Sequence, residues 1–125
     1  MKQVIHTDKA PKAIGPYSQA IRVGDTLYIS GQIPMNPATG KLVEPDITMQ
    51  TEQVMQNISA ILDEAGFTFA EVVKSTCLLS DMKNFAGMNE VYGKYYSQNP
   101  PARAAFAVKE LPLSVLVEIE TIAVK

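Results

Sequence analysis

The chain has 125 residues, 46% hydrophobic and 19% charged, with a formal net charge of −2 and a pI near 5.3. This length fits a single domain spanning residues 1–125, and the composition is that of an ordered globular protein. The 11 Lys and Arg residues are dispersed, with no two adjacent. The chain therefore has no basic stripe of the kind that binds a phosphate backbone, which argues against a nucleic-acid partner.

Several classes of site and location are excluded by what the chain lacks. Cys77 and His6 are the single residues of their kinds, so we expect no internal disulfide, no Cys-rich zinc site and no thiol–imidazole pair, which excludes most metal chemistry. The N-terminus lacks the apolar stretch of a signal peptide, and no segment reaches the roughly 20 apolar residues that cross a bilayer. We therefore expect a cytoplasmic protein without membrane contact.

The first forty residues predict short strands and a long loop. Val4–Ile5 is a strand candidate, and residues 20–23 and 26–30 form a predicted hairpin that turns at Gly24 and Asp25. Residues 31–40 are rich in proline and glycine and too long for a simple turn. This pattern predicts an irregular loop with a functional or interface role.

Two helices and a strand are predicted next. The first helix follows Asp46, which can act as its N-cap, and Gly66 stands at the position that ends a helix. Between them, apolar residues recur at helical spacing. Residues 72–80 are rich in β-branched side chains and predict a strand. Asp81 can cap a second helix, which the two prolines at 100–101 would end.

The last two strands are predicted over residues 100–108 and 115–124. The resulting order is three strands, a helix, a strand, a helix and two strands. It predicts an α+β fold, a single mixed six-stranded sheet with both helices on one face. Several strands are apolar on both faces, so the second face needs a cover. Association of copies of the chain through that face is the economical solution.

An arginine and two carboxylates interrupt these apolar strands. Glu118 and Glu120 share one face of the last strand because side chains alternate, and Arg103 lies in the strand before it. An arginine can bind a small carboxylate with two parallel hydrogen bonds, and a carboxylate beside it can transfer protons. Alternatively, all three are surface residues of strand ends and edges. The residues alone leave both interpretations open.

Four short segments carry a further signal: Ala13-Ile14-Gly15-Pro16-Tyr17-Ser18-Gln19, Ser30-Gly31-Gln32-Ile33-Pro34, Asn89-Glu90-Val91-Tyr92, and Pro101-Ala102-Arg103 with Val117-Glu118-Ile119-Glu120. Together they resemble the RidA or YjgF/YER057c/UK114 family, over about residues 7–125. The resemblance implies a chorismate-mutase-like fold and a homotrimer with its active sites between subunits, in agreement with the uncovered face of the predicted sheet.

The resemblance also implies an activity, the deamination of reactive enamine and imine intermediates released by pyridoxal-phosphate enzymes. The implied substrates are 2-iminobutanoate and 2-iminopropanoate, which water converts to 2-oxo acids and ammonia. Positioning and one acid/base group can supply this chemistry without metal or cofactor. By the same resemblance, Arg103 holds the substrate carboxylate and Glu118 holds the attacking water.

Further substrate-binding positions follow from the same resemblance. Tyr17 would line the pocket, Ser30 and Asn89 would add polar contacts, and Gly31 would permit close approach of the backbone. Ala105 stands where many relatives carry cysteine, which puts a thiol contact in doubt but not the hydrolysis. Without the resemblance, the residues favour an aromatic lid with no chemical role for Tyr17, and turn or cap hydrogen bonding for Ser30 and Asn89.

Two other functions compete with the deaminase. The same pocket could bind a 2-oxo acid or an amino acid without turnover and regulate a partner. A ribonuclease or translation inhibitor, as older names of the family imply, is the third hypothesis. The acidic pI and the absence of a basic patch and of tryptophan argue against it.

Overall fold

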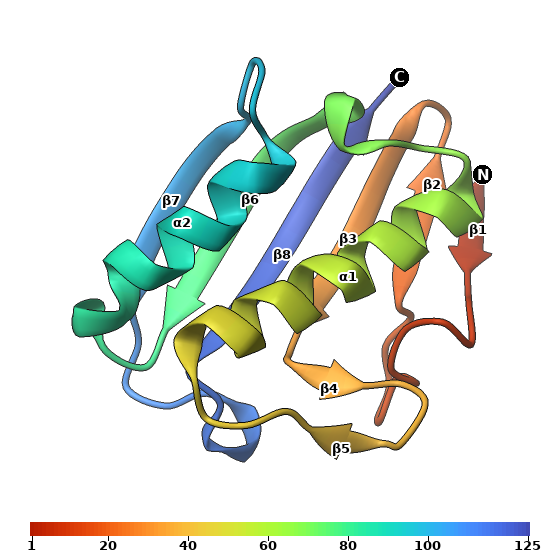
Figure 1. The fold of residues 1–125 in the computed structure, drawn as a ribbon. Helices are drawn as coiled ribbons and strands as arrows, with labels where there is room; N and C mark the ends of the chain where they lie inside the picture. Colours follow the sequence, from red (N-terminus) through yellow and green to blue (C-terminus); the bar gives the residue numbers. More distant parts are fainter.

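The computed structural model describes residues 1–125 as one mixed sheet with two helices on one of its faces (Figure 1). The strands lie in the order β1-β2-β3-β8-β6-β7, and only β6 and β7 run parallel. This confirms the predicted α+β fold and six-stranded sheet. The strands of the sheet are β1 (Lys2–Ile5), β2 (Ala20–Val23), β3 (Thr26–Gln32), β6 (Val72–Leu79), β7 (Ala102–Ala107) and β8 (Val117–Val124).

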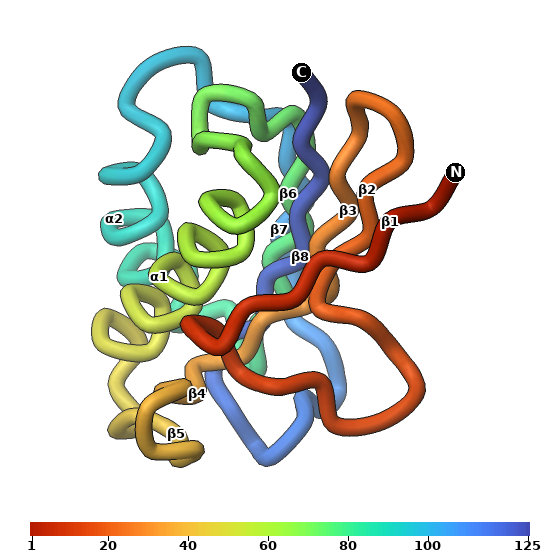
Figure 2. Tube along the Cα trace, turned by 90° about the vertical axis from the view of Figure 1, so that its right-hand side faces the viewer, coloured from red at the N-terminus to blue at the C-terminus, as the bar shows by residue number.

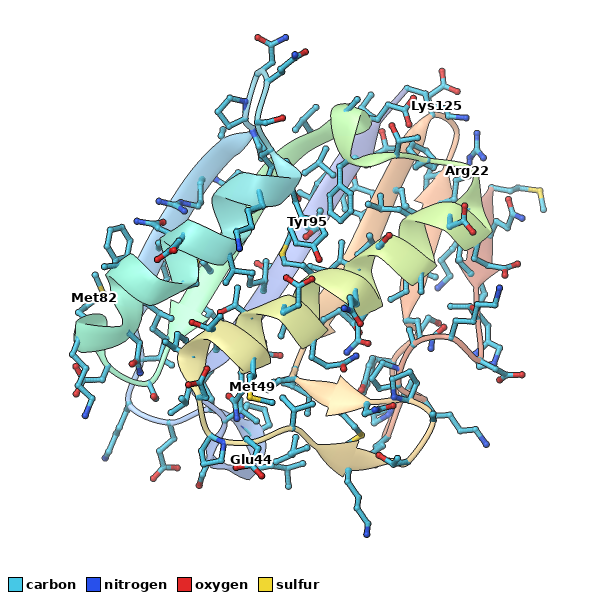
Figure 3. The ribbon with its side chains drawn as sticks, in the orientation of Figure 1. Arg22, Glu44, Met49, Met82, Tyr95 and Lys125 are labelled. Atoms are coloured by element: carbon cyan, nitrogen blue, oxygen red, sulfur yellow. The ribbon has the colours of Figure 1, made fainter.

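The helices α1 (Ile47–Ala65) and α2 (Phe85–Tyr95) pack beside each other on the same face of the sheet. Asp46 caps α1 as predicted, accepting a hydrogen bond from the Met49 N–H at 2.9 Å, and Gly66 ends it in the left-handed conformation at φ 78°. Tyr95 lies between the helices (Figure 3), where its hydroxyl donates to Glu52 on α1 at 2.5 Å. Neither helix has the combination of length and apolar character that a membrane span requires.

The opposite face of the sheet has no helix over it (Figure 2). Along β8, every second residue from Val117 to Ala123 is buried toward the helices, and the alternate residues from Glu118 to Val124 face the other way. Large apolar side chains on that second face remain substantially exposed, among them Tyr28 at 49%, Phe106 at 46% and Val124 at 39%. The chain itself therefore leaves an apolar sheet face uncovered, as the sequence predicts.

The prediction of an irregular loop over residues 31–40 is wrong in part. Gly31 and Gln32 still belong to β3, and β4 (Met35–Asn36) pairs with β5 (Lys41–Leu42) as a small second sheet. Neither strand contains proline, and the turn between them is closed by the Gly40 N–H, which donates to the Asn36 carbonyl at 2.8 Å. Pro34 and Pro37 flank the paired residues, so they leave this short ladder intact.

The second helix and the last strands are shorter than predicted. Asp81 caps the 3₁₀ turn η2 (Met82–Asn84), and α2 follows it. This helix ends at Tyr95, before the two prolines, which therefore do not terminate it. The strands β7 and β8 each begin two residues later than predicted. The chain between them forms the 3₁₀ turn η3 (Pro112–Ser114).

A buried glutamine fixes the segment that joins β1 to β2. Gln19 is 3% exposed and its side chain accepts a hydrogen bond from the Thr7 N–H at 2.7 Å. Its amide group donates to the carbonyl oxygens of Thr7, Ala10 and Pro11 at 3.0, 3.3 and 2.9 Å. One side chain thus organises the N-terminal segment that carries Tyr17.

Replacing Gln19 should loosen this segment. We expect Gln19→Ala to lower the free energy of unfolding by about 2–3 kcal/mol, because the backbone groups bonded to its side chain lose their partner. Urea unfolding at fixed protein concentration measures the change. Gln98→Ala, at an exposed position without a hydrogen-bonded side chain, is the matched control. Equal stability of the two variants would contradict the assignment.

Candidate active site

A cleft of about 590 Å³ opens on the helix-free side of the sheet, where the N-terminal segment, β3, β8 and η3 meet. Four of the residues predicted for the site line it together, namely Tyr17, Ser30, Gly31 and Glu118. Glu120 stands out with Glu118 in the sequence because the two share a face of the strand, whereas no sequence pattern indicates a role for Pro112 or Leu113. The further lining residues are Ile14, Ile33, Pro112, Leu113 and Glu120.

The cleft is shaped by a bulge in β3. Ile29 pairs with Thr121 and Gln32 pairs with Ile119, so two residues of β3, Ser30 and Gly31, lie opposite the single residue Glu120 of β8. A bulge bends its strand and redirects the side chains beside it. This irregularity places the backbone of β3 against the side chains on the outer face of β8.

Gly31 provides the space in which the Glu118 side chain lies. A Cβ atom at Gly31 would stand 2.9 Å from the Cδ atom of Glu118 and would overlap its carboxylate oxygen. Any larger residue at position 31 would therefore displace the carboxylate. The close approach expected at Gly31 is thus an approach to a glutamate side chain.

Ser30 and Tyr17 are both tied to the chain around them. The Ser30 hydroxyl donates to the Ser18 carbonyl at 2.6 Å, as the turn interpretation of this residue expects. The Tyr17 hydroxyl accepts a hydrogen bond from the Ile14 N–H at 3.3 Å, and Tyr17 stays 50% exposed at the cleft. Tyr17 is therefore held at the opening of the cleft with part of its surface available to a ligand.

The surroundings of Glu118 raise the pKa of its carboxyl group above the ordinary value. Partial burial raises the pKa of Glu118, and the negative charge of Glu120 on the same face raises it further. Such a rise brings a carboxyl group closer to the pH at which it can both accept and return a proton. Glu120 thus belongs to the cleft wall as well as to the apolar face.

Arg103 and Asn89 form a second cluster, between β7 and α2. An Nη atom of Arg103 donates to Asn89 Oδ1 at 2.7 Å. The Arg103 guanidinium also lies over two aromatic rings of α2, 5.0 Å from the centre of Tyr92 and 5.6 Å from that of Phe85. Asn89 and the rings hold the guanidinium from one side, while its other N–H groups make no hydrogen bond within the chain. They are free to bind an anion.

A single chain does not bring Arg103 and Glu118 together. Arg103 is the register partner of Ser75 and faces the helices, whereas Glu118 is the register partner of Leu78 and faces away from them. The two side chains therefore lie on opposite faces of the sheet, on strands separated by β6. A site that contains both groups requires two copies of the chain.

Ala105 lies beside the only thiol of the chain. It is the register partner of Cys77 on β6, on the same face as Arg103. Cys77 is fully buried, and burial raises the pKa of its thiol to about 11 although the Arg103 charge lowers it. The thiol is thus protonated and unreactive at neutral pH, and it acts as a small apolar group. No three His, Cys, Asp or Glu side chains gather in a group that could hold a metal ion.

The charge of Glu120 should be measurable at Glu118. We expect Glu120→Gln to move the pKa of Glu118 back toward that of an ordinary glutamate, because the repulsion between the two carboxylates is removed. A ¹³C NMR titration of the side-chain carboxyl groups follows this directly. The control is Glu110→Gln, which removes an exposed charge outside the cleft. A Glu118 pKa that is the same in both variants would show that Glu120 does not act on it.

The chain is similar to known proteins along nearly its whole length. The family model described as Endoribonuclease L-PSP matches residues 7–125. A RutC family protein of Pyrococcus horikoshii is 55% identical over 125 residues, which cover 100% of this chain and 99% of that protein. The 2-iminobutanoate/2-iminopropanoate deaminase of Capra hircus is 49% identical over 125 residues, which cover 100% of this chain and 91% of that protein.

A solved structure is similar to the whole fold. The crystal structure of a Thermotoga maritima protein, named as a candidate endoribonuclease, superposes with a TM-score of 0.98 at 51% sequence identity. The match covers 100% of this chain and 98% of that one. The arrangement of the sheet and helices described above is therefore shared along the entire chain.

Proposed function

The chain belongs to the Endoribonuclease L-PSP family, also known as the YjgF or RidA family, and we propose that it hydrolyses 2-iminobutanoate and 2-iminopropanoate to 2-oxo acids and ammonia. The observation that carries the proposal is the Glu118 carboxylate, partly buried against Gly31 in a cleft, with a raised pKa. The name of the Capra hircus relative supports this activity, whereas the name of the Pyrococcus horikoshii relative assigns only a family.

In this proposal, Arg103 binds the substrate carboxylate. Its planar guanidinium can form two parallel hydrogen bonds with a carboxylate, which a lysine ammonium cannot do. The bond to Asn89 and the contacts with the aromatic rings of α2 hold the guanidinium in place before the substrate arrives. A preorganised clamp of this kind orients the imine carbon for attack and lowers the entropic part of the barrier.

Glu118 supplies the proton transfers. It accepts a proton from a water molecule as the water oxygen attacks the imine carbon, and the electron pair of the C=N bond moves to nitrogen. The nitrogen then takes this proton back from Glu118, which gives the neutral carbinolamine. In a second transfer, Glu118 accepts the hydroxyl proton and passes it to the nitrogen as the C–N bond breaks and the C=O bond forms, which releases ammonia and the 2-oxo acid. A carboxyl group with a raised pKa suits both the acceptance and the return of the proton.

The site is formed between two chains of a homotrimer. Because Arg103 and Glu118 face opposite sides of one sheet, the Arg103 cluster of one chain has to meet the cleft of the next. Association would also cover the exposed apolar side chains of the helix-free face, among them Tyr28 and Phe106. Three chains related by a rotation that closes on itself give three equivalent sites.

Removing the proton-transfer group tests the reaction. Glu118→Gln keeps the shape of the side chain but not its basic oxygen, so we expect the hydrolysis rate to fall about a hundredfold or more. Binding of 2-oxobutanoate, which cannot be hydrolysed further, should persist. The measurement couples the protein to a threonine dehydratase that generates 2-iminobutanoate, with Glu110→Gln as the control.

The result also decides between the deaminase and its alternatives. Equal and small effects of Glu118→Gln and Glu110→Gln on the rate would show that Glu118 is not the proton-transfer group, and no hydrolysis by the wild-type protein would favour one that binds 2-oxo acids without turnover. A ribonuclease is disfavoured by the net charge of −2 and by the scattered Lys and Arg residues.

The shared site predicts complementation between inactive variants. Arg103→Lys and Glu118→Gln should each be nearly inactive alone. When the two are unfolded, mixed in equal amounts and refolded, about a quarter of the sites combine an intact Arg103 with an intact Glu118 from different chains. We therefore expect about a quarter of the wild-type activity to return.

The control for this mixture is Arg103→Lys combined with the double variant Arg103→Lys/Glu118→Gln, in which no site can have both residues intact. Activity that stays at the level of this control, while mass analysis shows mixed assemblies, would overturn the shared site.

A further inference from the structure

Four buried hydroxyl groups near α2 make no well-formed hydrogen bond with the protein's own atoms, although Ser75 approaches both tyrosine hydroxyls closely enough for a weak interaction. They belong to Ser75, Thr121, Tyr92 and Tyr96, of which none is more than 7% exposed. A buried hydroxyl without a good partner destabilises the folded state. Four such groups in one region are suited to sharing one hydrogen-bonding partner. Thr51, on α1, carries a fifth such group.

The four hydroxyl groups are neighbours. Ser75 and Thr121 are register partners on β6 and β8, and both point toward the helices. Tyr92 lies in the last turn of α2 and Tyr96 is the residue that ends the helix, and their ring centres are 4.7 Å apart. The Ser75 hydroxyl lies close enough to both tyrosines to lower their pKa against the larger rise caused by burial. We call these four residues the hydroxyl cluster.

The hydroxyl cluster is connected to Arg103. Ser75 is the register partner of Arg103 on β7, so the two residues are adjacent across the sheet and face the same side. The guanidinium lies 5.0 Å from the centre of the Tyr92 ring. One face of Tyr92 therefore supports the arginine while its hydroxyl end lies among the cluster.

We propose that the hydroxyl cluster binds an internal water molecule and that this water holds the Tyr92 ring in the orientation that supports Arg103. A buried water typically makes about three hydrogen bonds to groups that would otherwise be unpaired. Each hydroxyl can both donate and accept, so one water can connect three or four of them. Tyr92 is thus a positioning residue, and this role rests on the proposed function only insofar as Arg103 binds the substrate carboxylate.

The first test is a double-mutant cycle in stability. Ser75→Ala and Tyr92→Phe should each lower the folding equilibrium constant about tenfold, because each removes one ligand of the shared water. Together they should lower it by much less than a hundredfold, since the second change acts on a network that is already broken. Ser97→Ala, at an exposed position next to the cluster in sequence, is the control and should change nothing.

The opposite result would be equally clear. If the hydroxyl groups are simply unpaired, their removal relieves a desolvation cost, and both single variants become more stable than the wild type. Stabilisation or additivity would overturn the proposal. So would a crystal structure that resolves ordered waters elsewhere in the core but none among the hydroxyl cluster.

The second test measures the support of Arg103. Tyr92→Phe keeps the ring, so a purely steric role predicts unchanged binding of 2-oxobutanoate. We expect its dissociation constant, and KM for the imine, to rise about fivefold to tenfold, with a much smaller fall in kcat than in Glu118→Gln because the proton-transfer group is untouched. Wild-type affinity in Tyr92→Phe and Ser75→Ala would overturn the positioning role.

These outcomes are separate from failure of the proposed function. If Arg103→Lys weakens 2-oxobutanoate binding but the protein shows no imine hydrolysis, the deaminase proposal fails and the positioning role can still be measured by binding. If the protein hydrolyses the imine but Tyr92→Phe and Ser75→Ala bind 2-oxobutanoate as tightly as the wild type does, the positioning role of Tyr92 fails and the deaminase proposal stands.

Discussion

Side chains alternate along β8, and this alternation is the constraint from which the rest of the structure follows. One set of residues, such as Ile119 and Thr121, is buried beneath the helices, and the other set carries Glu118 and Glu120 on the opposite face. Because β8 is hydrogen-bonded to β3 on one side and to β6 on the other, its backbone cannot rotate to change which side chains face the helices. The carboxylates are therefore held on a rigid strand, against the bulge of β3, rather than on a flexible loop.

The partly buried position of Glu118 on β8 destabilises the ionised form of its carboxyl group. The folded-state pKa of Glu118 is raised, so the folded protein binds this proton more tightly than the unfolded chain does. Stability from this group consequently increases as the pH falls through the folded-state pKa, and it is reduced at neutral pH, where the carboxylate is ionised. The same desolvation that opposes the charge makes Glu118 a better proton acceptor.

Sequence patterns predicted the elements whose signals are local, and missed those determined by tertiary contacts. Asp46 and Gly66 mark the ends of α1 because capping acts within one turn of the helix. The bulge at Ser30 and Gly31 depends on pairing with β8 and left no local signal beyond a glycine. Likewise, Leu113 adopts a left-handed conformation at φ 56°, which nothing in its side chain favours, and it lines the cleft.

The family resemblance predicted candidate residues and a site between subunits, but it did not say which face of the sheet carries each residue. The family resemblance selected both Arg103 and Glu118, yet only strand register shows that one faces the helices and the other faces away. Such a division links function to assembly. An isolated chain carries Glu118, the proposed proton-transfer group, on one face of the sheet and Arg103, the proposed carboxylate clamp, on the other. If both take part in one reaction, the apolar contact that covers the sheet is also the contact that completes the active site.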